Sequence, residues 1–159
     1  MKWDQVGELP CSIARTASII GDRWTLLILR NAFLRMRRFE DFQAGLGLTR
    51  HLLASRLKRL VDEGVLARVP YQQSPLRHEY RLTDKGKALY PVLMALTAWG
   101  DAWMDKGAGP PLLLQHQTCG RRMHAVTVCS ECREPVDVHQ VMPLPGPGLA
   151  LRRRPRTAN

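Results

Sequence analysis

The chain has 159 residues, of which 45% are hydrophobic, enough for one ordinary domain with a packed core and a small appendage. Its formal net charge of +10 and its pI of about 10.2 predict a polyanionic partner, without distinguishing a nucleic acid from a membrane surface. No run of 18 apolar residues and no signal-peptide pattern occurs, so we expect a cytoplasmic protein that does not span a membrane.

The N-terminal part of the chain predicts two helices. The first is short, with Ser12 as its cap and Gly21 at its end. Its apolar face consists of Ile13, Ala17 and Ile20. Residues 24–34, opened by Asp22 or Arg23, are apolar on nearly every side, so we expect this second helix to be the central buried element.

A helix-turn-helix pair is predicted next. A third helix spans residues 39–46, and a short turn at residues 47–48 leads to a fourth. The inward-facing residues of the third helix are Phe39, Phe42 and Leu46. Before this helix, Arg37 and Arg38 lie in a basic turn where DNA phosphates could be met, and an ordinary solvated turn is the alternative.

The fourth helix has a defined start, two unlike faces and a defined end. Thr49 is expected to cap its first turn, and Gly64 to end it in a left-handed conformation. The buried stripe consists of Leu53, Leu57, Leu60 and Val61. The opposite face is cationic and rich in hydrogen-bond donors, and consists of Arg50, His51, Ser55, Arg56, Lys58 and Arg59. Taken alone, such a face is also typical of a solvated surface helix.

The segment after this helix favours DNA binding. Residues 67–71 and 77–82 predict two strands around a polar tip at residues 72–75, a loop longer than a tight turn. The inward positions of the second strand are Tyr80 and Leu82. The basic residues that this wing presents are Arg77 and Arg81. Residues 30–87 hold thirteen Lys or Arg against six Asp or Glu, and a helix followed by a basic hairpin is the arrangement of a winged helix-turn-helix DNA reader.

A long apolar helix is predicted after the wing, from Thr83 to about Asp105. Pro91 should bend this helix rather than end it. Its apolar stripe consists of Leu89, Val92, Leu93, Leu96, Trp99, Gly100 and Trp103. Because the stripe is wider than a small core can absorb, we expect part of it to pack against a second subunit, and a purely intramolecular core is the alternative.

Six segments of the chain match a known pattern in the right order: Cys11–Arg15, Ile20–Arg30, Arg38–Phe42, Ser55–Leu66, Glu79–Gly86 and Pro91–Gly100. Together they resemble the HxlR family of bacterial transcription regulators, relatives of the MarR-type winged helices. The resemblance covers residues 10–104 and implies a homodimer that binds operator DNA through the Thr49 helix and the wing at residues 71–81. It also implies a dimer interface at Ile13, Ala17, Leu96, Trp99 and Trp103. Residues 45–49 depart from the Pro-Gly-Ile-Ser-like turn common in the family, which affects base preference.

Cys11 aligns with the cysteine that begins the first helix of the family, and in some members this residue senses electrophiles or oxidants. Such chemistry needs a thiolate, which a helix N-terminus and the nearby Arg15 would favour. The alternative is a small buried apolar residue.

The remaining chain predicts further regions beyond the winged helix of residues 1–105. Residues 106–111 read as a linker, because glycine and proline dominate them. Residues 112–142 are expected to form a small zinc-ribbon-like module. Residues 143–159, with the basic stretch 152–156, read as a flexible tail that adds non-specific DNA affinity.

The module contains two pairs of candidate ligands with a ligand-x-x-ligand spacing. The four residues are His116, Cys119, Cys129 and Cys132. A Cys₃His set with this spacing is a common structural Zn²⁺ arrangement with no open position for catalysis. Rival nitrogen ligands are His124 and His139. Reduced surface thiols or a Cys129–Cys132 redox couple are the alternatives to a metal.

These features predict a mainly α protein of α+β type, a winged helix-turn-helix with a two-stranded wing, a long C-terminal dimerisation helix and a ribbon-like module. Paired carboxylates, a phosphate-binding glycine loop and a Ser/His/Asp set do not stand out, so an enzyme is not expected. The predicted function is a homodimeric repressor that reads a pseudo-palindromic site in double-stranded DNA, under an unidentified small-molecule or redox effector. The alternative is a protein-binding or assembly module whose winged helix no longer reads DNA.

Overall fold

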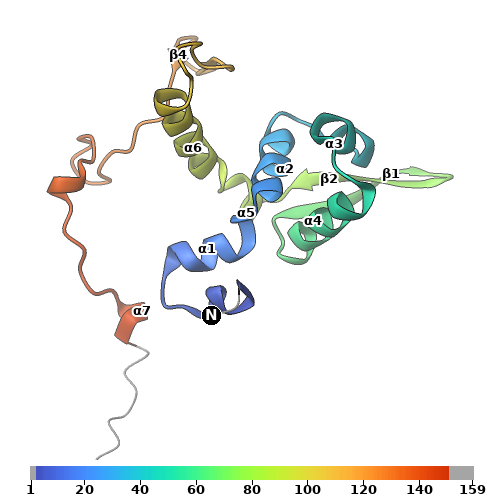
Figure 1. The fold of residues 1–159 in the computed structure, drawn as a ribbon, viewed down its shortest axis with the longest axis horizontal. Coiled ribbons are helices and arrows are strands. Elements are labelled where there is room, and N and C mark those ends of the chain that lie inside the picture. The colour runs from blue at the N-terminus through green and yellow to red at the C-terminus, as the bar shows by residue number, and fades with distance from the viewer. Residues whose placement is uncertain (1–2, 151–159) are drawn as a thin grey trace, which may run out of the picture. The chain divides into compact units, whose positions relative to one another are not determined.

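The computed structural model describes residues 3–150, whose contacts form two compact units. The larger unit comprises residues 19–125, and the smaller combines the described residues that precede and follow it. No helix within the described range is long and apolar enough to cross a membrane. The helices and the wing that the sequence predicted for DNA reading lie in the larger unit (Figure 1).

Three helices build the core of the larger unit. They are α2 (Arg23–Phe33), α3 (Phe39–Leu46) and α4 (Arg50–Asp62). Ile28 and Leu29 of α2, Phe42 of α3, and Leu53 and Leu57 of α4 are all 0% exposed. Each such side chain contributes about 1.5–3 kcal/mol by its removal from water, before the entropic cost of ordering the chain. The apolar stripes predicted from spacings of three and four residues therefore meet in one cluster.

The ends of these helices are set by local side chains and by glycines. Asp22 Oδ1 accepts hydrogen bonds from two backbone N–H groups in the first turn of α2, each at 3.1 Å. Thr49 Oγ1 accepts one from the backbone N–H of Leu52 at 3.4 Å, at the start of α4. Gly64 follows α4 with φ of +66°, the left-handed conformation that favours glycine. The predicted start and end of α4 are confirmed.

The wing is an antiparallel hairpin (Figure 1). Its strands are β1 (Leu66–Gln73) and β2 (Leu76–Leu82). The predicted tip at residues 72–75 was too long, because β1 continues to Gln73 and a cis peptide bond between Ser74 and Pro75 makes the connection. Backbone hydrogen bonds hold the ladder, so polar side chains do not end it. The register shifts between Pro70 and Gln72, so Tyr71 forms a bulge in β1.

The helix predicted from Thr83 to Asp105 is instead two helices, α5 (Asp84–Lys87) and α6 (Tyr90–Trp103). Pro91 lies in the first turn of α6 and does not bend a continuous helix. Proline has no N–H to donate, and its ring clashes with the carbonyl four residues earlier. A helix can therefore begin at Pro91 at little cost but cannot pass through it cheaply, and the predicted bend was wrong.

The N-terminal elements are a 3-10 helix, η1 (Trp3–Glu8), which the sequence analysis did not predict, and α1 (Ser12–Ile20). The backbone N–H of Arg15 donates to the carbonyl of Cys11 at 3.0 Å, so Cys11 rather than Ser12 stands at the cap position of α1. The apolar face of α1 is buried at Ile20, which is 6% exposed, but Ile13 is 81% exposed. The helix thus has an uncovered apolar residue near its start.

Short elements follow α6. They are β3 (Leu114–Gln115) and β4 (Arg122–Met123), which pair in the larger unit, and η2 (Val138–Gln140) and α7 (Pro147–Ala150) in the smaller one. Residues 123–128 alternate in polarity as a strand would, but they form only the end of β4 and an isolated bridge between Val128 and Pro135. Alternating side chains predict a strand only where a neighbouring strand pairs with it along its length. The basic stretch 152–156 lies outside the described residues.

Candidate nucleic-acid interface

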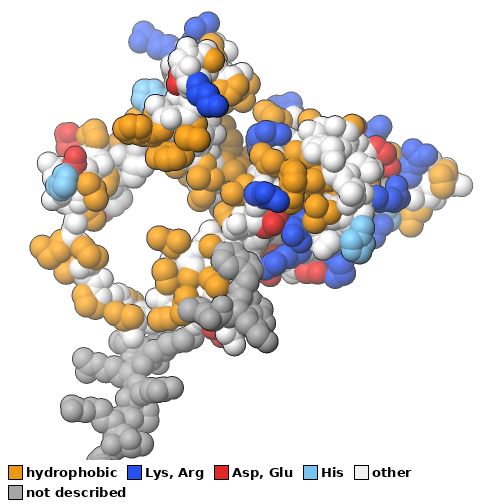
Figure 2. Space-filling model, in the orientation of Figure 1, with side chains coloured by type: hydrophobic (Ala, Val, Ile, Leu, Met, Phe, Trp, Pro, Cys, Tyr) orange, Lys and Arg blue, Asp and Glu red, His pale blue; other side chains and the backbone are white. Residues whose placement is uncertain are grey.

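The start of α3, the start of α4 and the wing border a polar groove with a volume of about 620 Å³. Its basic side chains are Arg38, Arg50, Arg68, Arg77 and His78. Glu40 and Asp41, in the first turn of α3, are the acidic residues that line it. Figure 2 shows Lys and Arg side chains gathered over the face that carries these helices and the wing. The surplus of cations in a solvent-open groove suits a polyanion such as the DNA backbone.

Two of these arginines are held by aromatic rings. The guanidinium of Arg38 lies 4.9 Å from the ring centroid of Tyr71, and that of Arg50 lies 5.1 Å from the ring centroid of Phe39. Both arginines are nevertheless exposed. Stacking on a ring restricts the rotamers of the arginine side chain while its N–H donors stay available. Less side-chain entropy is therefore lost when the arginine contacts DNA.

The outer face of α4 carries most of the residues predicted to contact DNA. The exposed members are Thr49, Arg50, His51, Ser55, Lys58 and Arg59. Lys58 Nζ lies 2.6 Å from Asp62 Oδ2 in a fully solvated pair one helical turn apart. Such pairs are weak, so the pair does not prevent Lys58 from meeting a phosphate.

Arg56 lies elsewhere on α4. Its Nε lies 2.9 Å from Asp22 Oδ1 and one terminal nitrogen lies 3.3 Å from Asp22 Oδ2, which ties the middle of α4 to the cap of α2. Burial by itself raises the pKa of Asp22, but the hydrogen bonds from Arg56 and Thr25 outweigh it and hold the pKa below its ordinary value. This bidentate ion pair occupies the guanidinium of Arg56, which was predicted to contact DNA.

Asp22→Ala is expected to lower the free energy of unfolding by about 2 kcal/mol, because α2 loses its cap and Arg56 loses its partner. The lowered pKa of Asp22 means that its contribution is present above the unfolded pKa of about 4 and is lost as pH falls through the folded pKa. Urea denaturation at pH 7 and at pH 3 measures both effects: the gap between wild type and variant should be large at pH 7 and narrow at pH 3. Asp62→Ala, which removes a solvated pair, is the control and should change stability little. An equal loss in both variants would contradict the role given to Asp22.

The wing is fastened to the basic turn before α3. The backbone N–H of Tyr80 donates to the carbonyl of Arg37 at 2.7 Å, and the backbone of Arg38 forms an isolated antiparallel β-bridge with that of Glu79. Glu79 is 8% exposed and pairs with Arg81, two residues further along β2. A buried carboxylate in a strand predicted to alternate was not expected, and its ion pair explains why it is tolerated there.

Sequence reasoning missed Arg68, His78 and Tyr71, which line the groove. Arg68 and Tyr80 face each other across the hairpin. Arg68 is the one charged residue of β1 and lies between Ala67 and Val69, which was the signal that could have located it. The contribution of Tyr71 depends on the bulge, which local sequence does not reveal.

Residues 19–108, more than half of the chain, match the model of the HxlR-like helix-turn-helix family. This chain belongs to the HxlR family. The HTH-type transcriptional regulator Rv3095 of Mycobacterium tuberculosis is 44% identical over 141 residues, which are 89% of each chain. The HTH-type transcriptional regulator YvaP of Bacillus subtilis is 39% identical over 92 residues, which are 57% of this chain and 85% of that protein.

A solved structure supports the same assignment. PA1607, described as a proposed transcription factor, superposes with a TM-score of 0.79 and 36% identity, over 87% of this chain and 96% of its own. This HxlR protein is therefore a DNA-binding transcriptional regulator with a winged helix-turn-helix fold, and not an enzyme.

The HxlR match ends before the first pair of candidate metal ligands. His116 and Cys119 close a turn in which the N–H of His116 donates to the carbonyl of Arg121 at 2.9 Å and the N–H of Gly120 donates to the carbonyl of His116 at 2.8 Å. Gly120 has φ of +67°. Cys119 Sγ lies 3.4 Å from His116 Nδ1, so the first pair of candidate ligands is already side by side.

The second pair lies on a turn with the same backbone pattern. The N–H of Cys129 donates to the carbonyl of Glu134 at 2.9 Å, and the N–H of Arg133 donates to the carbonyl of Cys129 at 3.0 Å. Arg133 has φ of +64°, a conformation costly for any residue but glycine. Hydrogen bonds from the backbone N–H groups of Cys132 and then Glu131 lower the pKa of Cys129, which favours the thiolate that binds metals.

The two turns belong to different compact units. Among residues 3–150, no three His, Cys, Asp or Glu side chains are grouped so that they could hold a metal ion. The four-ligand zinc site therefore stays a prediction. Cys11 is exposed at the start of α1, where a thiol is accessible, and its sensing role also stays a prediction.

Proposed function

We propose that this HxlR protein is a homodimeric repressor, acting in the cytoplasm, that reads a pseudo-palindromic operator with α4 and the wing. The observation that carries the proposal is the groove in which Arg50, at the start of α4, and Arg77, on the wing, line one surface. A helix in the major groove with a wing beside it meets base edges with the first part of the helix and the DNA backbone with the remainder. Two such helices would occupy half-sites about 10–10.5 base pairs apart.

The exposed residues of the proposed DNA-binding surface fall into two groups, candidates for contacts with base edges and candidates for contacts with phosphates. Candidates for base edges lie in the first half of α4 and are Arg50, His51 and Ser55, with Thr49 at the cap. Candidates for phosphates are Arg37, Arg38, Lys58 and Arg59, and Arg77 would reach the flanking minor groove or its phosphates. Arg56 and Arg81, which pair with Asp22 and Glu79, would act by orienting α4 and the wing rather than by contacting bases.

The dimer is proposed from the apolar surface of two helices. On α6, Leu96, Trp99 and Trp103 are 48%, 60% and 74% exposed. On α1, Ile13 is exposed and Ala17 is partly buried. Exposed tryptophans at helical spacing mark an interaction surface, and a second copy is the partner that a two-fold operator requires.

The test of DNA reading is selection of genomic fragments by the purified full-length protein, in competition with bulk duplex at near-physiological salt. Retention of a few fragments that share an inverted repeat would support the operator reading. Retention without selectivity that disappears as salt rises would contradict it, because charge alone would then explain binding. The assembly-module alternative would be favoured by that second outcome.

We also propose that His116, Cys119, Cys129 and Cys132 bind one structural Zn²⁺. Support comes from the donor set and from the two turns, each of which presents its pair on the same hydrogen-bonded backbone. Four protein ligands would hold the ion without an open position. Metal binding would cross-link segments that bury little apolar surface of their own.

Purified protein is expected to carry one zinc per chain by elemental analysis, and Cys132→Ser is expected to lose it. Cys11→Ser removes a cysteine outside the set and serves as the matched control, so its zinc content should remain at the wild-type value. Cobalt in place of zinc should show thiolate-to-metal absorption in the wild type, and His116→Ala should alter that spectrum while His124→Ala and His139→Ala should not. If wild-type protein that is purified with zinc in every buffer contains no bound zinc, the proposal is wrong.

A further inference from the structure

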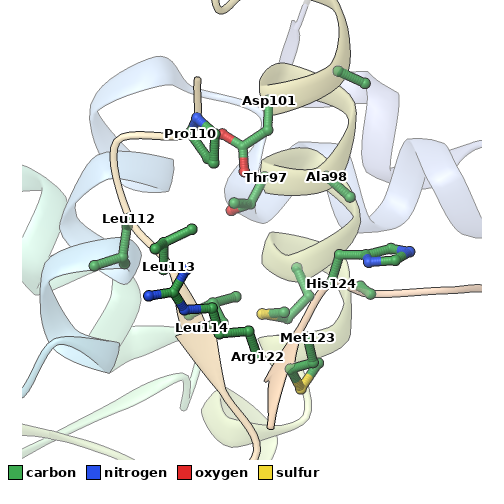
Figure 3. A pocket seen from close by; sticks show the side chains of 13 residues that line it. Thr97, Ala98, Asp101, Pro110, Leu112, Leu113, Leu114, Arg122, Met123 and His124 are labelled. Atoms are coloured by element: carbon green, nitrogen blue, oxygen red, sulfur yellow. The ribbon is translucent and has the colours of Figure 1, made fainter. Parts of the chain in front are cut away.

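We propose that a cavity beside α6 binds a small apolar amine that regulates DNA binding. The cavity has a volume of about 460 Å³ and lies between α6 and the β3–β4 hairpin, within the larger unit (Figure 3). Small-molecule sites are commonly concave, mostly apolar and about 300–1,000 Å³ in volume. The regulatory part of this inference rests on the proposed function, but the binding part does not.

The walls of the cavity are apolar on both sides. Met94 and Ala98 lie one helical turn apart on α6, and Leu113, Leu114 and Met123 face them from the hairpin. Met94 is 8% exposed, so the floor of the cavity is continuous with buried structure. An apolar ligand body would remove this surface from water, which favours binding in proportion to the apolar area buried.

One acidic group gives the cavity its charge preference. Asp101 follows Ala98 on the same face of α6 and is partly buried, and within residues 3–150 its carboxylate has no hydrogen bond or ion pair. Figure 3 shows Asp101 beside Thr97 and Pro110 at one end of the cavity, with Arg122 at the other end. The hydroxyl of Thr97 donates to the carbonyl of Leu93 at 3.0 Å, which leaves its oxygen free to accept a bond from a ligand N–H.

These groups select an organic cation rather than an anion. A carboxylate on an apolar wall favours a protonated amine, since the pair is less screened there than in open water. Arg122, which also lines the cavity, is exposed at the hairpin, where water partly screens its charge. The ligand class is therefore an apolar body with one ammonium group placed near Asp101 and Thr97.

Occupancy would act on DNA binding through α6. The cavity touches Thr97, Ala98 and Asp101, while Leu96, Trp99 and Trp103 of the same helix form the proposed dimer surface. The start of α6 packs on α2, where the rings of Tyr90 and Phe33 have centroids 4.9 Å apart. A ligand that binds one placement of α6 more tightly would shift the population of DNA-competent dimers.

Calorimetric titration of the full-length protein with 2-(1-naphthyl)ethylamine tests the site. One amine per chain should bind, and 1-naphthylacetate, which has the same ring with a negative charge, should bind at least about tenfold more weakly. Asp101→Asn should cost the amine about tenfold in affinity, and Ala98→Phe, which fills the cavity, should prevent binding. Asp62→Asn, an equal charge change on α4, should leave the affinity unaltered.

Equal affinity of the amine for wild type, Asp101→Asn and Ala98→Phe would overturn the site. Tighter binding of the acetate would overturn the ligand class. Amine binding that appears only in a variant unable to dimerise would show that a second copy covers the cavity, which also overturns the proposal. The amine should in addition weaken operator binding by the wild type but not by Asp101→Asn. If the amine binds in the calorimeter but the protein shows no selective DNA binding, the proposed function is wrong and the proposed site stands.

Discussion

Trp99→Glu is expected to convert the proposed dimer to monomers and to weaken binding to an operator with two half-sites by about 10²–10⁴-fold, the usual gain from linking two binding modules. Trp99 is 60% exposed on α6 between Leu96 and Trp103, so the apolar surface around it needs a partner. A carboxylate at the centre of that surface would be buried without a counter-charge on association. Light scattering measures the mass in solution, and fluorescence anisotropy measures affinity for the full operator and for a single half-site.

The control for this change is Leu34→Glu. Leu34 is also a large exposed side chain, 52% exposed, but it follows α2 and lies outside the proposed interface. This variant should remain dimeric with unchanged DNA affinity. Half-site affinity of Trp99→Glu should equal that of the wild type, which separates lost pairing from lost folding. A dimeric Trp99→Glu protein would exclude α6 as the interface.

Arg50→Gln is expected to weaken binding to the operator by about 5–150-fold while changing affinity for random duplex little, because a bidentate base contact contributes about 1–3 kcal/mol of discrimination. Arg50 begins α4, stacks on Phe39 and lines the groove. The change keeps a polar side chain of similar length and preserves the cap at Thr49. Anisotropy titrations at several salt concentrations with operator and random duplex measure both affinities.

Lys106→Gln is the matched control, since it removes one positive charge beyond α6 and outside the groove. It should leave the ratio of specific to non-specific affinity at the wild-type value. An equal loss by Arg50→Gln on both duplexes, with a salt slope reduced by about one, would instead assign Arg50 to a phosphate.

The helices that present the interface could be predicted because their signals are local. The bounds predicted for α3 agree with the structure, and α4 begins after its predicted cap at Thr49 and ends before Gly64. A cap depends on residues two or three positions apart, and an amphipathic face repeats within two turns. The same local signals gave a wrong prediction at Pro91. The apolar pattern on both sides favoured one continuous helix, but proline has no backbone N–H to donate, and the chain forms two helices there.

Side-chain partners far apart in the sequence could not be predicted. Arg56 and Asp22 are separated by 34 positions, and nothing near either residue indicates the other. Glu79 occupies a strand position whose neighbours suggested exposure, but it is 8% exposed where β2 forms a backbone bridge with Arg38. These pairings depend on the angles at which α2, α4 and the wing pack, which follow from the whole core.

The amino-acid sequence was enough to establish the order and type of the main elements, the cationic and buried faces of α4, and membership of a DNA-binding family. Hydrophobic periodicity and helix capping act over a few residues, so they can be read without the fold. Which cations remain available to DNA depends on the fold. Arg50 and Arg38 stack on aromatic rings within one groove, whereas Arg56 and Arg81 form ion pairs with carboxylates. The interactions of a charged side chain depend on the groups within a few ångströms of it, because electrostatic energy falls with distance. Packing, rather than order along the chain, determines which groups those are.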